Sequence, residues 1–411
     1  ILISLNSSPT GTTGSWSATC STTSGTNSTR TRWIRAAKIC IRILFASEKR
    51  LSEKIFQGLG NACSCFMVET TIKDCAIQLF NFVEALTSSR RSPSRLFRIL
   101  DLYNTTSVLL PDVDVIFESE SIRIQAARLL PSVAEMARGI LQEFENALLH
   151  ELSTVVDRRG RIHPLTGYVV GYITQISCHK KTLTRLIVSK PSMDGDVEFS
   201  QLAGRTPLAV HLIWIVDILQ FNLKKKSKYY EDPSLAKLFM INNVHYIVQQ
   251  IETCLALREM IGEDYIDKLT ENVRQAVIDY QRSTWDVIFH CLRDEEQHVG
   301  RSLFPFSFGL LLSTKKSIKE RFKTFNARFQ EIYRTQTTWL VLDSQLRDEL
   351  RLSISEELIP AYRSFHARFE SQLGSGRKAY IKYTVEDLVT AISNFFQGHP
   401  IYQVRDSRRS H

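Results

Sequence analysis

Hydrophobic residues recur at intervals of three and four along most of the chain, which is the spacing of amphipathic helices. The pattern begins in the segment 32–51, where mainly basic residues occupy the opposite face. Its apolar positions are Trp33, Ala36, Ala37, Cys40, Ile41 and Leu44. A late segment repeats the scheme with Val273, Ala276, Val277, Tyr280, Val287, Ile288 and Cys291. No stretch of useful length alternates apolar and polar residues, so we predict an all-α fold.

Residues 204–251 predict a helical hairpin. Thr206 before Pro207, and Asp232 before Pro233, each place an N-cap residue ahead of a first-turn proline. The first helix carries apolar residues on most faces, namely Leu208, Leu212, Ile213, Trp214, Ile215, Val216, Ile218, Leu219 and Phe221. We therefore expect this helix to be buried on most sides.

Breaks rich in Pro, Gly, Ser and charge divide the remaining helices. Residues 1–31 are dominated by Ser, Thr, Gly and Asn, and we expect a disordered or aberrant low-complexity segment there. We predict a helical bundle region over 32–195, a central helical bundle over 196–300 and a basic C-terminal bundle over 301–411. Antiparallel helices packed in consecutive bundles would bury the apolar faces.

Composition narrows the class of protein. The 411 residues are 43% hydrophobic and 23% charged, which is ordinary for a soluble protein. The longest apolar run, 207–221, is shorter than the roughly 20 residues of a membrane span, so none is expected. The chain begins with Ile1 and lacks a basic leader region, so we expect no secretory signal and interpret it as a fragment or an incomplete gene model.

Motifs of enzymes and metal sites are absent from the sequence. No nucleotide-binding glycine loop, zinc-protease helix or nucleophile elbow occurs, and we expect no catalytic residue, cofactor or metal ion. The eight cysteines include no CxxC pair, which fits a reducing cytosol, and Cys63 and Cys65 are the only close pair. We interpret the scattered histidines, such as His163 and His211, as structural residues.

Positive charge is concentrated in the last quarter of the chain. Residues 301–411 hold 18 Lys and Arg against 11 Asp and Glu, within a chain of net charge +9. A helix over 317–339 would bury a stripe of apolar residues and project Lys316, Lys319 and Lys323 from one flank. That stripe is Ile318, Phe322, Phe325, Phe329 and Ile332. Arg377, Lys378 and Lys382 precede a helix start at Thr384.

Clusters of this kind attract anionic lipid head groups by about 1 kcal/mol per basic residue. An ordinary solvated helix face has the same pattern, so charge alone leaves both interpretations open. The densest basic run, Lys224, Lys225, Lys226 and Lys228, is a possible second contact. Its lysines either complement the macrodipole at a helix C-terminus or meet a lipid, an acidic partner or RNA. No RNA-binding motif accompanies them.

Nine further segments, in order along the chain, resemble one family. They are RWIRAAKICIRILFASEKRL (32–51), AIQLFNFVEAL (76–86), RRSPSRLFRILDLY (90–103), GRIHPLTGYVVGYI (160–173), DYQRSTW (279–285), IKERFKTFNARF (318–329), RTQTTW (334–339), LIPAYRSF (358–365) and YIKYTVEDL (380–388). Together with the hairpin, they resemble the C-terminal half of the seventy-kilodalton subunit of the exocyst, most closely its plant branch.

The resemblance implies a fold and a function. The fold would be an elongated rod of helical bundles, and the function tethering of secretory vesicles to the plasma membrane during exocytosis. The partners would be other exocyst subunits and membranes containing phosphatidylinositol 4,5-bisphosphate, with small Rho-type GTPases as further candidates. The protein would be cytoplasmic and peripheral at the inner face of the plasma membrane.

The family's lipid-binding residues carry over in part. Lys382 matches the lysine within YIKY, and Lys319, Arg321 and Lys323 match the basic pattern of the preceding helix. Ala379 stands where the family has a second lysine, and Lys378 is displaced by one residue. Two alternatives remain: a helical scaffold that binds only proteins, as a diverged paralogue in autophagy or immunity, and a basic RNA-binding helical protein.

Overall fold

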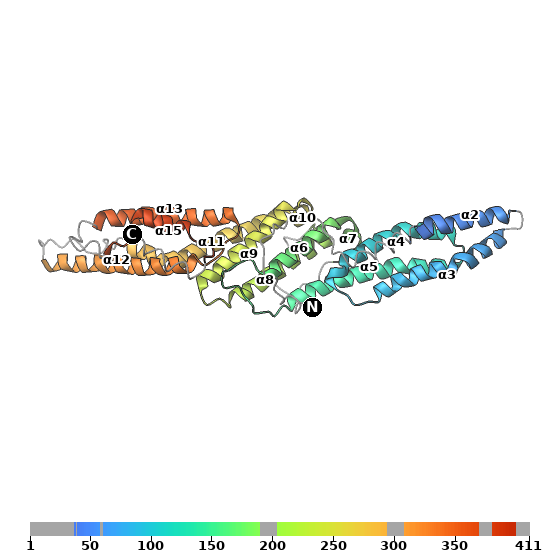
Figure 1. The fold of residues 1–411 in the computed structure, drawn as a ribbon, viewed down its shortest axis with the longest axis horizontal. Coiled ribbons are helices and arrows are strands. Elements are labelled where there is room, and N and C mark those ends of the chain that lie inside the picture. The colour runs from blue at the N-terminus through green and yellow to red at the C-terminus, as the bar shows by residue number, and fades with distance from the viewer. Residues whose placement is uncertain are drawn as a thin grey trace. The chain divides into compact units, whose positions relative to one another are not determined.

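The computed structural model describes residues 37, 39–57, 61–189, 204–293, 308–369 and 380–399, with the backbone alone for 61–71 and 308–317. Over these residues the predicted all-α fold is confirmed, because they form helices and a single isolated bridge between Leu340 and Gln397. The chain divides into two compact units, Ile1–Ile140 and Leu141–His411, each of which is a set of packed helices (Figure 1).

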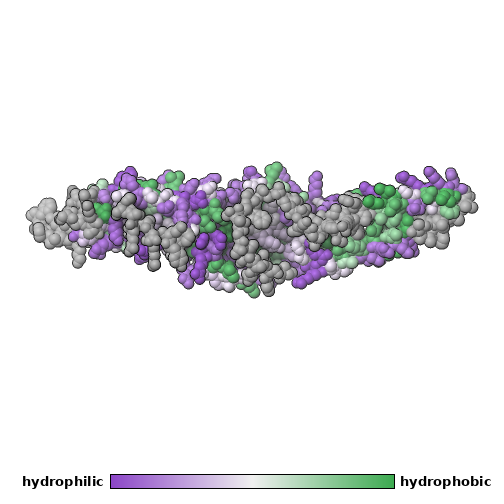
Figure 2. All heavy atoms as spheres, viewed as in Figure 1, coloured by the Kyte–Doolittle hydropathy of each residue, from purple (hydrophilic) through white to green (hydrophobic). Residues whose placement is uncertain are grey.

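The first unit contains a π-helical turn, η2 (Cys40–Phe45), followed by α2 (Ala46–Ile55), α3 (Asn61–Thr87), the short 3-10 helix η3 (Pro93–Arg95) and α4 (Leu96–Ile116). It also takes the first part of α5 (Glu120–Leu149). Helix α2 packs against α3, and η2 packs against α4. On the face drawn in Figure 2, hydrophobic residues gather among the hydrophilic ones over this unit.

The π turn changes which residues of the first helix are buried. Ala37, Ile41 and Phe45 point inward at intervals of four, whereas Leu44 is 51% exposed. A π turn takes in more residues than an α turn, so the inward face moves by one position. The prediction of a buried Leu44 was therefore wrong, and Phe45 takes its place.

The second unit begins with the end of α5, and its described residues continue through nine helices. They are α6 (Pro164–Cys178), α7 (Lys180–Leu186), α8 (Pro207–Ser227), α9 (Pro233–Thr253), α10 (Leu255–Ile261), α11 (Glu263–Leu292), α12 (Phe308–Gln336), α13 (Ser344–Phe369) and α15 (Val385–Ser393). Helix α9 packs along α11, and α8 lies against α6 and α9.

The predicted hairpin is confirmed as α8 and α9. The Thr206 hydroxyl accepts a hydrogen bond from the Ala209 amide at 3.3 Å, and Asp232 Oδ1 accepts one from the Ser234 amide at 2.8 Å. Phe221 differs from the prediction, because 54% of it is exposed. Val287 on α11 is likewise 48% exposed. Both residues lie at the edge of an otherwise buried face.

Helix α8 is long and apolar enough by composition to cross a membrane, contrary to the expected shortfall in length. However, 67% of its apolar window is buried inside the protein. Leu212, Ile215 and Leu219 are fully enclosed. Packing against α6 and α9 thus makes α8 a core helix of the second unit.

Helices α12, α13 and α15 enclose an aromatic core. Phe322 lies 4.6 Å from Phe365, and Phe325 lies 4.8 Å from Tyr362, between ring centroids. The predicted stripe on α12 is buried from Ile318 to Phe329, with Ile332 half-buried. Thr384 begins α15 as predicted, with a reciprocal capping box to Asp387.

The predicted division at residues 31, 195 and 300 falls in ranges outside the described residues. The assignment of three successive helical regions therefore stays a prediction.

Candidate functional site

Two lysines on α12 converge on one aromatic ring. Lys319 Nζ lies 5.2 Å and Lys323 Nζ lies 5.9 Å from the centroid of Tyr380. They are four residues apart, so the helix places them on one flank, as the sequence predicted. The negative face of the phenol ring attracts both ammonium groups. Lys319 is half-buried and Lys323 is exposed.

The segment 380–384 is held against α12 and α13 by its backbone. Asn326 Nδ2 donates a hydrogen bond to the Tyr380 carbonyl at 2.6 Å, and the Tyr362 hydroxyl donates one to the Tyr383 carbonyl at 2.6 Å. Ile381 and Tyr383 pack on the core, whereas Lys382 between them is exposed. The anchored backbone therefore keeps Lys382 on the surface, two residues from the ring that the other lysines approach.

Glu320 moderates the charge of this surface. Its carboxylate forms an ion pair with Lys323 at 2.9 Å, and this hydrogen bond raises the pKa of Lys323 above its ordinary value. The lysine therefore stays protonated at neutral pH. Because the pair is exposed, a competing anion can replace Glu320 at little cost.

Arg321, on the same helix, contacts the end of α11 and the Phe365 ring of α13. Its Nε donates a hydrogen bond to the Cys291 carbonyl at 2.9 Å, a second nitrogen donates to the Arg293 carbonyl, and the guanidinium lies 4.7 Å from the Phe365 ring. These carbonyls belong to the C-terminal end of α11, which favours a positive charge. Arg321 thus joins α11 to α12 and α13.

The other predicted residues of this cluster are not all described. The side chain of Lys316 and the whole of Arg377 and Lys378 lie outside the described residues. The structure therefore brings Lys319 and Lys323 together at Tyr380, and it leaves Lys382 exposed two residues after that ring.

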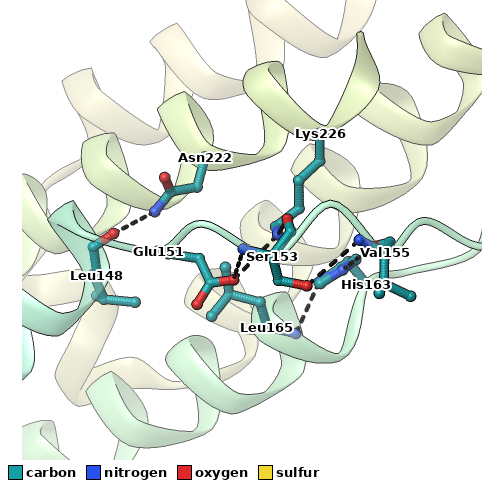
Figure 3. Close-up of polar contacts among 8 residues, drawn as sticks. All are labelled: Leu148, Glu151, Ser153, Val155, His163, Leu165, Asn222 and Lys226. Carbon is teal, nitrogen blue, oxygen red and sulfur yellow. Dashed lines mark hydrogen bonds and ion pairs between the residues drawn. The ribbon is translucent and has the colours of Figure 1, made fainter. Parts of the chain in front are cut away.

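The second basic run divides into two kinds of lysine. Lys224, Lys225 and Lys228 are exposed at the end of α8. Lys226 is only 2% exposed, and its ammonium lies 3.3 Å from Glu151 Oε1 and donates to the Ser153 carbonyl. Figure 3 shows Lys226 reaching from α8 to the connector that follows α5. The possible external contact of the four lysines is therefore corrected for Lys226, whose ammonium group is paired inside the protein.

The end of α5 and the connector are each fixed at a further point (Figure 3). Asn222 Nδ2 donates to the Leu148 carbonyl at 2.7 Å, one turn before Lys226 on α8. His163 caps α6, because its Nδ1 accepts from the Leu165 amide at 3.1 Å while Nε2 lies 3.1 Å from the Val155 carbonyl. Burial is the largest influence on this ring and lowers its pKa, so a neutral imidazole with its proton on Nε2 fits both contacts.

Among the described residues, no three His, Cys, Asp or Glu side chains lie close enough to hold a metal ion. The side chains of Cys63 and Cys65 lie outside the described set. His211, interpreted as structural, pairs through Nδ1 with Glu145 at 2.5 Å.

Sequence reasoning missed the residues that position the basic ones. Asn326 and Tyr362 were not singled out, although both hold the Tyr380 segment. Their only sequence signals are a polar residue beside a buried aromatic stripe and an aromatic residue with a hydroxyl. Neither signal identifies the hydrogen-bond partner, which lies 54 residues from Asn326 and 21 residues from Tyr362.

The fold and these sites define an α-helical protein whose lysines lie in clusters on rigidly packed helices. Residues 31–394 match the model of the Exo70_C family, the C-terminal part of the Exo70 exocyst complex subunit. Exocyst complex component EXO70B1 of Arabidopsis thaliana is 35% identical over 375 residues, which are 89% of this chain and 57% of that protein. Exocyst complex component 7 of Homo sapiens is 25% identical over 295 residues, 70% of this chain and 39% of its own length.

Solved structures agree on the fold. The crystal structure of the S. cerevisiae exocyst component Exo70p matches with a TM-score of 0.55 at 14% identity, covering 89% of this chain and 70% of that one. The chain therefore belongs to the Exo70 C-terminal family, the family that its sequence resembles. It spans 57% of the length of EXO70B1 and 58% of EXO70A1, both from Arabidopsis thaliana.

Proposed function

We propose that this chain acts as the C-terminal region of an exocyst subunit that tethers secretory vesicles to the plasma membrane. Family membership supports the proposal, since relatives that match nine-tenths of the chain are named as exocyst components. Its partners would be other exocyst subunits, with small Rho-type GTPases as further candidates. It would lie in the cytoplasm, peripherally bound at the inner face of the plasma membrane.

The lipid contact is assigned to the basic surface of the last helices. The observation that carries it is the convergence of Lys319 and Lys323 on Tyr380, two residues before the exposed Lys382. The proposed lipid contact also includes Lys316, Arg377 and Lys378. Arg321 contributes by fixing α12 against the end of α11 rather than by its own exposure. Phosphatidylinositol 4,5-bisphosphate is the proposed ligand because its clustered phosphates suit several nearby ammonium groups.

Three described lysines give a contact of modest strength. Each basic residue near an anionic membrane adds a small favourable term, so removal of all three should weaken vesicle binding by roughly tenfold or more. The interaction should also weaken with salt, because the Debye length falls from about 10 Å at 0.1 M to about 3 Å at 1 M.

The test compares two triple variants of the full chain. Lys319→Ala, Lys323→Ala and Lys382→Ala remove the proposed contact. Lys54→Ala, Lys73→Ala and Lys181→Ala remove the same charge from exposed positions elsewhere. Co-sedimentation with vesicles containing phosphatidylinositol 4,5-bisphosphate should fall only for the first variant, at unchanged helicity by circular dichroism. An equal fall in vesicle binding for both variants would show that binding depends on the net charge of the chain and not on the position of these three lysines.

A further inference from the structure

The end of α8 presents one aromatic and three cationic side chains on a single face. Phe221, Lys224, Lys225 and Lys228 follow the spacing i, i+3, i+4 and i+7, and all are exposed. Lys225 Nζ lies 4.2 Å from the Phe221 ring. Within the described residues, Lys224 and Lys228 form no ion pair. Neutralisation of a helix C-terminus does not require an exposed phenylalanine, so this face calls for a further explanation.

This face borders a groove formed by α8, α9 and α11. The groove has a volume of about 250 Å³ and is lined chiefly by apolar side chains. Phe221 and Lys224 form the α8 side, Met240 and Val244 the α9 side, and Val273 and Ala276 the α11 side. A space of this size is below the ~300–1,000 Å³ of typical small-molecule pockets, but it suits one or two apolar side chains of a docked element.

We propose that this groove and its lysine rim bind an acidic amphipathic helix of a partner protein. The apolar stripe of such a helix would insert between Val273, Ala276 and Met240. Carboxylates beside the stripe would meet Lys224 and Lys228, whose ammonium groups are free of other ion pairs among the described residues. This is helix-in-groove recognition, in which apolar anchors supply affinity and flanking charges supply orientation.

Charge and shape together favour a peptide over a membrane at this place. A lipid head group would use the lysines alone, and its binding would be indifferent to the shape of the groove. An acidic helix would use both the lysines and the groove. From Phe221 to Lys228 the rim extends about 10 Å along α8, so the partner needs roughly two helical turns of acidic residues.

The two parts of the site can be removed separately. Ala276→Trp fills the groove without changing a charge, because Ala276 is half-buried on its wall. Lys224→Glu with Lys228→Glu reverses the rim without altering the core, since both side chains are exposed. Neither variant changes Lys319, Lys323 or Lys382, so the outcome is independent of the lipid contact proposed above.

The probe is a displayed library of 16-residue helices built from Glu, Asp, Leu, Phe and Met, selected on the full chain. Fluorescence anisotropy of an enriched peptide should show binding that weakens at least tenfold for each variant and weakens with salt. A peptide with the same composition in scrambled order is the matched control. Vesicles containing phosphatidylinositol 4,5-bisphosphate should bind the wild type and Ala276→Trp equally.

Three results would overturn the proposal. One is a selection that yields no peptide dependent on both the groove and the rim. Another is equal binding of the scrambled peptide, which would show attraction by charge alone. A third is a loss of vesicle binding in the rim variant with no effect on peptide binding, which would make the lysines a lipid contact. Circular dichroism checks whether Ala276→Trp folds. If Ala276→Trp unfolds, the rim variant, Lys224→Glu with Lys228→Glu, decides the question.

Discussion

Lys226 and its neighbours on α8 have opposite surroundings although they are adjacent in sequence. Lys225 is exposed over Phe221, whereas Lys226 is buried against Glu151, whose side chain is 8% exposed. A buried charge that loses its partner carries the full cost of desolvation. The lysine run therefore contains one buried structural residue, Lys226, and three exposed lysines.

We predict that Lys226→Met lowers the free energy of unfolding by about 3 kcal/mol, because Glu151 is left buried without its cation. Lys224→Met, at an exposed position, should change it by less than about 0.5 kcal/mol. Urea denaturation followed by circular dichroism measures both. Combining Lys226→Met with Glu151→Gln should recover part of the loss, and similar costs for the two lysines would contradict the assigned roles.

His163 gives the connector a dependence on pH. Since burial lowers its pKa in the folded chain, the unfolded chain binds a proton more readily. The contribution to stability is complete above the ordinary pKa of about 6.5 and is lost as the pH falls through that value toward the lower folded pKa. Protonation would also place a proton on Nδ1, where the Leu165 amide now donates.

His163→Asn should reduce this sensitivity, because Asn caps a helix without titrating. Between about pH 7.5 and about pH 5.5, the free energy of unfolding should fall less for the variant than for the wild type. The pKa of Asp157 lies below its ordinary value, so this nearby carboxylate stays ionised across this range in both proteins, and the difference between them isolates the histidine. An identical fall in both would show that the ring does not titrate in this range.

At the scale of elements, the 380–384 segment depends on α12 for its position. Asn326 is 4% exposed and donates to the Tyr380 carbonyl at 2.6 Å. Asn326→Ala should cost about 1 to 2 kcal/mol in stability, since it leaves that carbonyl without its partner. Hydrogen exchange measured by mass spectrometry should rise in the peptide that contains Lys382.

The Asn326 variant should also weaken vesicle binding although it removes no charge. Thr390→Ala, at an exposed position of α15, is a suitable control, because its hydroxyl donates a hydrogen bond to the Glu386 carbonyl of the same helix. Faster exchange with unchanged vesicle binding would show that the position of Lys382 is not important to the contact.

Elements with local causes were predictable from sequence. The caps at Thr206, Asp232 and Thr384 act within three residues, so sequence spacing determines them. Lys226 and Arg321 were not predictable in the same way, because their partners lie 75 and 30 residues away. The burial of Leu44 was predicted wrongly because a fixed helical period assumes uniform α-helical geometry, which the π turn interrupts.

At the scale of the whole molecule, both lysine surfaces belong to the second unit, Leu141–His411. The aromatic core of α12, α13 and α15 restricts Lys319, Lys323 and Lys382 to one bundle, and the α8, α9 and α11 helices carry the separate lysine rim. The chain could thus meet a membrane through one surface and a protein through another. The family was recognisable from collinear segments, whereas the contacts that orient each lysine came only from the structure.

Membrane attachment through the basic surface is the central claim. Its most direct test is co-sedimentation of the chain with neutral vesicles and with vesicles containing phosphatidylinositol 4,5-bisphosphate, at low and high salt. We predict binding only to the charged vesicles, with a loss of binding at high salt because screening weakens the attraction. A folded, helical protein that ignores both kinds of vesicle would contradict the claim and favour a scaffold that binds proteins alone.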